Sequence, residues 1–144
     1  MNKFMTQNSY VRWYNDLDMS DIDIVGGKNA SLGEMIKNLT NAGIKIPRGF
    51  ATTAYAYKQF IKVNDLEQPI SKILTDYQSG EISLEVAGLN IRKLILNRTF
   101  PIVFAESIGN AYDELSKLYN KDELGVAVRS SATAEDLPQA SFAG

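Results

Sequence analysis

The chain has 144 residues, about the size of one domain; 44% are apolar and 22% are charged, which fits a globular protein. Its net charge of −2 argues against binding to duplex nucleic acid. It contains no Cys and no His, which excludes disulfides, thiolate zinc sites, Ser-His-Asp triads and a phosphohistidine on this chain. No apolar run approaches the ~18 residues of a membrane span, and the first residues lack a secretory h-region. With the absence of Cys, this fits a cytoplasmic protein.

The first third of the chain predicts one strand and one helix. Residues 10–14 combine aromatic and β-branched side chains and predict a short strand, which an acidic turn over residues 15–23 follows. Ser31 and Glu34 have the spacing of a capping box, and apolar residues recur after them at helical spacing. A helix is therefore expected from this box to a C-cap at Gly43.

Four further helices are expected after an extended segment over residues 44–50. Thr52 or Thr53 is suited to cap the first of them, and Ser83 to cap the third. Pro101 falls in the first turn of the last, where proline is well tolerated. The four helical patterns extend to Val63, over residues 69–77, to about Ile95 and to about Leu118.

The end of the chain changes character. Residues 125–128 (GVAV) predict a short buried strand that ends at Arg129, and residues 130–144 have the small, polar composition of a loop. The overall expectation is an α+β fold with about five helices and a few short strands. Because the sequence stops in a glycine-containing loop, we expect it to be part of a larger domain.

The sequence Gly26-Gly27-Lys28, just before a helix, is the first candidate site. Glycines let backbone N–H groups approach a ligand closely, and a helix N-terminus with a lysine suits a phosphate. The alternative is ordinary turn chemistry. The segment is not a Walker A loop, because Ile22 stands where that loop needs Gly, and Asn29 stands where it needs Ser or Thr.

Arg129, at the end of the predicted strand, is the second candidate. Its guanidinium offers a rigid fork of donors that matches phosphate oxygens, and Ser130 and Ser131 follow it with two hydroxyls. The alternative is an ordinary surface ion pair of Arg129 with Glu135 or Asp136.

Two other patterns have structural interpretations. An acidic run has the composition of a calcium loop, but the EF-hand template fails, because Asp21 replaces the required Gly and Gly27 the required Glu; a solvated turn is expected instead. A set of aromatic residues has the spacing of core residues rather than of a base-stacking platform. The acidic run comprises Asp16, Asp18, Asp21 and Asp23, and the aromatic set comprises Tyr55, Tyr57, Phe60, Phe100, Phe104 and Tyr112.

Three long motifs together resemble a known family. They are residues 25–35 (VGGKNASLGEM), 46–53 (IPRGFATT) and 127–136 (AVRSSATAED), and residues 13–15 (WYN) add to the likeness. In this order and spacing they resemble the nucleotide-binding region of the pyruvate phosphate dikinase family, in particular its phosphoenolpyruvate synthases (pyruvate, water dikinases).

The resemblance implies that residues 1–144 are the N-terminal subdomain of an ATP-grasp domain. In this family, ATP pyrophosphorylates a histidine on a separate domain, water takes the γ-phosphate, and the remaining phosphoryl group passes to pyruvate. The family's ATP-binding Lys and Arg fall on Lys28 and Arg129, and Arg129 would also offset charge that develops during transfer. The family's glycine-rich phosphate loop begins at Ser141, Ala143 and Gly144.

Family members are several times longer than this chain. Their acidic Mg²⁺ ligands, phosphohistidine domain and pyruvate domain have no counterpart in it, so we expect an N-terminal fragment that is inactive without the remaining domains as its partners. Two alternatives remain open at this point. One is a related dikinase-type phosphotransferase, for example one that phosphorylates an antibiotic, and the other is a non-catalytic nucleotide-binding module.

Overall fold

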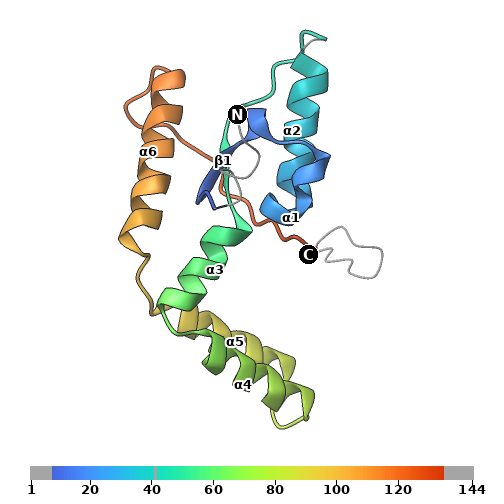
Figure 1. Cartoon of the computed structure of the whole chain (residues 1–144), viewed down its shortest axis with the longest axis vertical. Helices are drawn as coiled ribbons and strands as arrows, with labels where there is room; N and C mark the ends of the chain where they lie inside the picture. Colours follow the sequence, from blue (N-terminus) through green and yellow to red (C-terminus); the bar gives the residue numbers. More distant parts are fainter. Residues whose placement is uncertain (1–7, 41, 135–144) are drawn as a thin grey trace. The chain divides into compact units, whose positions relative to one another are not determined.

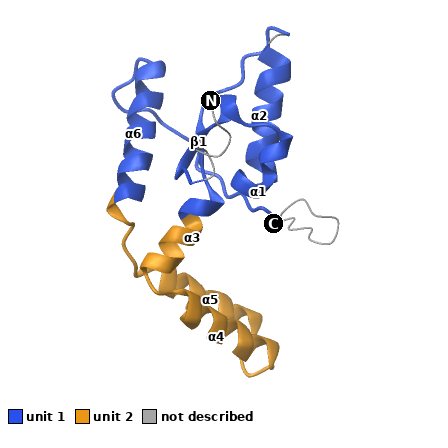
Figure 2. Ribbon diagram, in the orientation of Figure 1, with its two compact units in different colours: residues 1–56, 103–144 blue, residues 57–102 orange. Residues whose placement is uncertain are grey.

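The computed structural model describes residues 8–40 and 42–134. Within these residues the fold is α+β, with six α-helices, two short 3₁₀ helices and one two-stranded sheet (Figure 1). The chain divides into two compact units, which Figure 2 distinguishes by colour: the first takes residues from 1–56 and 103–144, and the second residues 57–102. None of the helices in the described ranges is long and apolar enough to cross a membrane.

The sheet of the first unit joins two short antiparallel strands, β1 (Val11–Trp13) and β2 (Phe50–Thr52). Trp13 pairs with Phe50, and their rings meet edge to face with centroids 5.7 Å apart. The predicted strand over residues 10–14 is therefore confirmed, and the extended segment that leads to Phe50 supplies its partner.

Two 3₁₀ helices and two α-helices connect the strands. Asp18 and Asp21 form a capping box: the Asp18 carboxylate accepts from the Ser20 N–H at 2.9 Å, and the Asp18 N–H donates to Asp21 Oδ2 at 3.0 Å. The predicted acidic turn is thus a helix start. The elements are η1 (Tyr14–Asp16), η2 (Met19–Asp21), α1 (Ile22–Val25) and α2 (Gly27–Thr40).

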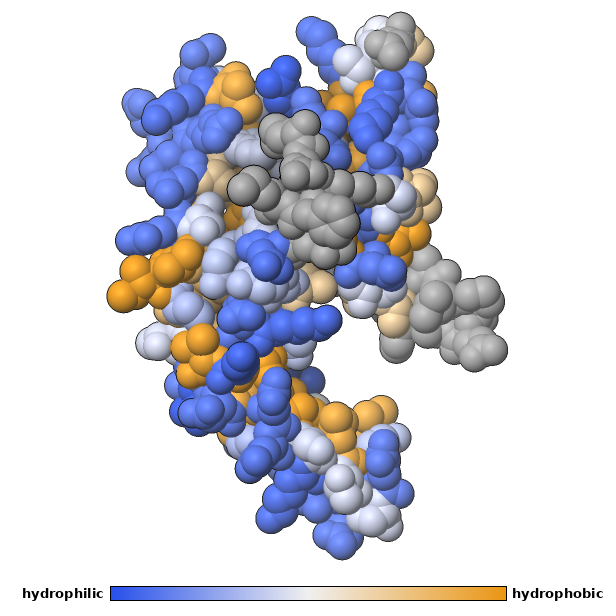
Figure 3. Space-filling model, viewed as in Figure 1, coloured by the Kyte–Doolittle hydropathy of each residue, from blue (hydrophilic) through white to orange (hydrophobic). Residues whose placement is uncertain are grey.

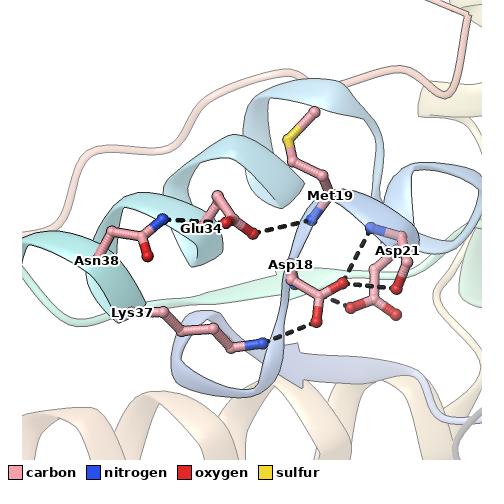
Figure 4. A network of polar contacts seen from close by, with 7 residues as sticks. Asp18, Met19, Asp21, Glu34, Lys37 and Asn38 are labelled. Atoms are coloured by element: carbon pink, nitrogen blue, oxygen red, sulfur yellow. Dashed lines mark hydrogen bonds and ion pairs between the residues drawn. The ribbon is translucent and has the colours of Figure 1, made fainter.

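The capping box predicted at Ser31 and Glu34 is wrong, because α2 already begins at Gly27. Both residues lie inside the helix, and the Glu34 carboxylate accepts from the backbone N–H of Met19 at 3.4 Å (Figure 4). The helix can start earlier because Gly26 supplies a turn between α1 and α2. The spacing of Ser31 and Glu34 therefore coincides with a capping box without being one.

The core of the first unit lies between α2, the residues before it and β2. Gly33 sits directly against Leu17, such that a Cβ built on Gly33 would lie 2.5 Å from the Leu17 Cβ. This close approach lets the helix backbone cover a leucine that is completely buried. The core consists of Leu17, Val25, Ala30 and Ala51, with Tyr14, Ile22 and Ile24 packed against it.

Helix α6 (Ile102–Leu118) belongs to the first unit for almost all of its length. The Phe104 ring stacks on Tyr10, just before β1, with centroids 5.5 Å apart. Beyond the other end of the helix, the Tyr119 hydroxyl accepts from the Arg48 N–H at 2.8 Å. These two contacts connect both ends of α6 to the segments that form the sheet.

The second unit is built from helices. The Ser83 hydroxyl accepts from the Val86 N–H at 3.3 Å, and Thr53 Oγ1, at the end of the first unit, accepts from the Ala56 N–H at 3.1 Å. Both predicted caps are therefore confirmed, with Thr53 rather than Thr52 at the first. The helices are α3 (Ala54–Val63), which starts in the first unit, α4 (Glu67–Gln78) and α5 (Leu84–Leu96).

The second unit exposes many large apolar side chains, which Figure 3 shows among hydrophilic ones. Helix α4 has no buried residue, and α5 buries only Ala87. The exposed apolar residues of this unit include Tyr57, Val63, Leu74, Tyr77, Leu84, Leu89, Leu96, Phe100 and Ile102.

The aromatic set predicted as core is only partly buried. Phe60 and Phe104 are buried as expected, whereas Tyr57 and Phe100 are more than half exposed. Helix α3 buries Ala56, Phe60 and Ile61, whereas Tyr57 is 57% exposed. Phe100 lies in a connection, where its ring contacts Phe60 at a centroid distance of 5.6 Å.

The strand predicted over residues 125–128 is wrong. The structure assigns no strand there, and Val128 is 92% exposed. A β-strand needs a neighbour for its backbone hydrogen bonds, and among the described residues only β1 and β2 form a ladder. Arg129 therefore follows an exposed segment without regular secondary structure rather than a buried strand.

Candidate anion-binding site

Gly26 forms the turn between α1 and α2. Its φ is +83°, a backbone conformation that glycine adopts without strain. The Gly26 N–H donates to the Ile22 carbonyl at 2.8 Å, and the Gly26 carbonyl accepts from the Ala30 N–H at 3.1 Å. One residue thus closes the first helix and opens the second, which fixes the direction in which the N-terminus of α2 points.

The N-terminus of α2 is electropositive. The helix has 14 residues, its first turn contains no acidic residue, and Lys28 in that turn is exposed. The aligned peptide dipoles place a partial positive charge at this end, to which the lysine adds a full charge. This combination suits an anion.

The segment that follows Arg129 lies on the Gly26 turn. The Ser131 hydroxyl donates to the Val25 carbonyl at 3.2 Å, across 106 positions of sequence. A Cβ on Gly26 would collide with the Ser131 hydroxyl and would lie 2.9 Å from the carbonyl oxygen of Ala132. In Figure 1 the red end of the chain accordingly runs beside α1. The structure therefore brings together the two segments that the sequence singled out for phosphate binding.

Tyr14 is a residue on which the charge of Arg129 acts, and sequence reasoning did not indicate it. Its ring lies beside Gly49, and its backbone N–H donates to the Gly49 carbonyl at 3.1 Å. Partial burial raises the pKa of the Tyr14 phenol, and the positive charge of Arg129 acts in the opposite direction. The exposed Arg129 guanidinium is thus near enough to Tyr14 to influence its ionisation.

Several predicted site residues fall beyond the part of the chain that the structure describes. Ser141, Ala143 and Gly144, which the family resemblance assigns to a phosphate loop, lie outside it. Glu135 and Asp136, the alternative partners of Arg129, also lie outside it. The contact of Ser131 with Val25, by contrast, lies within the described residues, although no spacing rule in the sequence would have indicated it.

The acidic run near residue 20 forms a polar network that supports the fold (Figure 4). Asp18 Oδ2 lies 2.8 Å from Lys37 Nζ, which ties η2 to α2. This bond to Lys37, with those to Ser20, holds the pKa of the Asp18 carboxyl well below its usual range. Among the residues described, no three acidic side chains are arranged to hold a metal ion.

The glycine turn, the lysine at the start of α2 and the arginine-bearing segment that contacts the turn combine features that suit phosphate-like anions. Residues 22–144 match the model of the pyruvate phosphate dikinase AMP/ATP-binding domain. The chain belongs to this family.

Several curated relatives are phosphoenolpyruvate synthases. The chain is 49% identical over 135 residues to the enzyme of Aquifex aeolicus and 47% identical over 135 residues to that of Escherichia coli. It is 46% identical over 136 residues to a probable phosphoenolpyruvate synthase of Methanocaldococcus jannaschii. These matches cover 93%, 93% and 94% of this chain. The chain spans only 16%, 17% and 11% of the three relatives.

Proposed function

We propose that this chain is the N-terminal ATP-binding part of a phosphoenolpyruvate synthase. The contact of Ser131 and Ala132 with the Gly26 turn carries the proposal, because it joins two motifs that are far apart in the sequence into one site. Membership of an AMP/ATP-binding domain family and the names of the relatives support it. Those names favour this enzyme over an antibiotic-phosphorylating relative.

In this proposal the triphosphate of ATP binds between the start of α2 and Arg129. The N-terminus of α2, which begins at Gly27, presents backbone N–H groups to phosphate oxygens, and Lys28 adds a point charge. Arg129 grips two oxygens with its planar fork and offsets the charge that develops on the transferred group. Ser141, Ala143 and Gly144 would extend the same phosphate-binding surface.

The whole enzyme would convert ATP, pyruvate and water to phosphoenolpyruvate, AMP and phosphate. Because this sequence contains no His, the histidine that carries the phosphoryl group would belong to another domain of the protein. The remaining domains are therefore the proposed partners of this one, and residues 1–144 would form the first subdomain of an ATP-grasp fold in the cytoplasm. By itself, the chain is expected to release neither AMP nor phosphate from ATP.

Mg²⁺ commonly accompanies ATP, to which it supplies charge neutralisation. The described residues offer no set of three carboxylates for it. We therefore assign the metal ligands to other parts of the enzyme and derive no step through the metal.

The test is an NMR titration of the ¹⁵N-labelled chain with ATP. ATP should shift the amide signals of Gly26, Gly27 and Ser131, with a dissociation constant near or above millimolar, which corresponds to only about 4 kcal/mol. Arg129→Lys keeps the charge but loses the fork, so it should weaken these shifts, and Lys28→Gln should weaken them as well. Lys121→Gln, an exposed lysine after α6, is the matched control.

Three results would contradict the proposal. The first is that the amide signals of Gly26 and Gly27 do not shift when ATP is present at about 10 mM, ten times a millimolar dissociation constant. ATP could also act equally on the Lys28→Gln and Lys121→Gln variants. Finally, the chain alone could turn over ATP and pyruvate above a heat-killed control.

A further inference from the structure

The Val25 carbonyl, at the last residue of α1, accepts two hydrogen bonds from side chains. The Asn29 amide donates to it at 2.7 Å from within the first turn of α2, and the Ser131 hydroxyl donates at 3.2 Å. A carbonyl oxygen has two lone pairs and accommodates both donors. The bond to Asn29 is local, whereas the bond to Ser131 attaches a distant segment of chain to the turn.

The absence of a side chain on Gly26 makes the attachment possible. Because any Cβ there would collide with the Ser131 hydroxyl, the two backbones meet closely only at a glycine. The positive φ of Gly26 directs its carbonyl into α2 at the same time. The turn thus fixes the position of Ser131 in two ways: the absent Cβ of Gly26 leaves room for its side chain, and the Val25 carbonyl accepts its hydrogen bond.

Arg129 lies two residues before this anchor, in a segment that lacks other regular support. No strand is assigned to residues 125–130, all of which are exposed. An arginine at the surface otherwise samples many rotamers, and ordering it costs conformational entropy. An anchor two residues away limits where the Arg129 backbone can lie and hence where its guanidinium can reach.

We propose that Ser131 is a positioning residue, whose hydrogen bond to the Val25 carbonyl holds Arg129 beside the Gly26–Gly27–Lys28 turn. The purpose of this placement, binding of ATP phosphates, rests on the function proposed above. The placement itself does not, because Tyr14 reports the position of Arg129 without any nucleotide.

The Tyr14 phenol provides the first readout. Arg129 lowers its pKa against the effect of burial, so moving the guanidinium away raises the pKa further. The ¹³Cζ signals of labelled tyrosines follow each phenol separately during a pH titration. The chain has seven tyrosines, and a Tyr14→Phe variant identifies the relevant signal.

The experiment compares four variants of the 144-residue chain. Arg129→Gln should raise the pKa of Tyr14 by removing the charge, and Ser131→Ala should raise it in the same direction by releasing the segment. Ser131→Thr keeps the hydroxyl and should restore the native value. Ser130→Ala, at the exposed neighbouring hydroxyl, should leave it unchanged.

ATP binding provides the second readout, by the same amide shifts as above. Ser131→Ala should weaken ATP binding at least threefold, whereas Ser131→Thr and Ser130→Ala should bind as the native chain does. Far-UV circular dichroism establishes that each variant is folded at the temperature of the measurement.

The outcomes separate the two proposals. A native Tyr14 pKa in Ser131→Ala, next to a raised pKa in Arg129→Gln, would overturn the positioning role. So would an unchanged ATP affinity in Ser131→Ala when Arg129→Gln binds more weakly. If no variant alters ATP binding but the Tyr14 pKa moves as described, the proposed function fails, and the placement of Arg129 by Ser131 stands.

Discussion

The contacts inside the first unit differ in kind from those inside the second. In the first, bonds join segments far apart in sequence, such as Arg48 with Tyr119 and Ser131 with Val25. In the second, helix caps and turns join near neighbours, and a bond from Asn64 to the Thr99 carbonyl at 3.3 Å spans the base of the α4–α5 hairpin. The proposed site lies in the unit where non-local contacts fix the backbone.

This difference predicts where the chain is sensitive to substitution. A site assembled from distant segments requires each close contact between them, and tightly packed contacts tolerate little added volume. A helical hairpin with exposed faces should tolerate most single changes, at a cost within about 1 kcal/mol. Substitutions matched between the two kinds of environment test this comparison.

The largest effect is expected for Gly33→Ala. The new Cβ would lie 2.5 Å from the Leu17 Cβ and closer still to the Leu17 carbonyl, where backbone cannot yield easily. We expect a loss of more than about 3 kcal/mol in the free energy of unfolding, measured by urea denaturation followed by circular dichroism. Gly88→Ala in α5 of the second unit is the control, because its Cβ meets only the end of the flexible Arg92 side chain. It should stabilise the chain by about 0.5–1 kcal/mol, and equal effects of the two changes would refute the comparison.

Thr53→Ala should have the next largest effect. Thr53 is buried, and its hydroxyl caps α3 and also donates to the Ser9 carbonyl at 2.5 Å. The variant loses the cap and leaves a carbonyl without its partner, which should cost about 2–3 kcal/mol. Thermal unfolding measures the loss. Thr53→Ser retains both hydrogen bonds and should recover most of the stability. A serine variant that melts at the same temperature as the alanine variant would show that these hydrogen bonds do not stabilise the fold.

Ser83→Ala should cost less, about 1 kcal/mol, since this cap is exposed and its hydrogen bond is local. Hydrogen exchange should increase at the start of α5, while the exchange of β1 and β2 amides should remain at its native rate. Faster exchange throughout the sheet would mean that the two units unfold together. The units would then differ in the kind of contact they contain but not in their stability.

The smallest effect is expected from the ion pair of Asp18 with Lys37. Because this pair lowers the pKa of Asp18, its stabilisation is present above the ordinary aspartate pKa of about 4 and is lost as pH falls below that value. Asp18→Asn keeps a capping oxygen but removes the charge. The difference between the melting temperatures of the native chain and this variant should therefore be largest at pH 7 and shrink as pH falls from about 4 to about 2, and a difference that stays constant over this range would exclude the charge as its cause.

Local chemistry made much of the fold predictable. The strand at residues 10–14 and the caps at Thr53 and Ser83 depend on near neighbours, and the structure has them where the sequence indicated. The capping box at Ser31 failed because a single residue, Gly26, started the helix sooner through a positive φ. The strand before Arg129 failed because a strand also depends on a neighbour, which its own residues cannot specify.

The site was predictable in its components but not in its assembly. Glycines before a helix and an arginine after an apolar run are visible as patterns, which is why Lys28 and Arg129 could be named as candidates. The contact between their two segments depends on the close approach of Ser131 to Gly26, and the raised pKa of Tyr14 depends on partial burial beside Gly49. Neither contact follows from spacing, because each joins segments that only the folded chain brings together.

The edge-to-face pair of Trp13 and Phe50 gives the protein a built-in optical reporter. Trp13 is the sole tryptophan of the sequence, and it belongs to the first unit, at the register of β1 with β2. Excitation at the red edge of indole absorbance therefore addresses the first unit alone, with no signal from residues 57–102. In one unfolding experiment, the emission of Trp13 consequently follows the first unit. The helical ellipticity also includes α4 and α5 of the second unit. Coincident transitions would identify a single cooperative block, and displaced transitions would give each unit its own melting point.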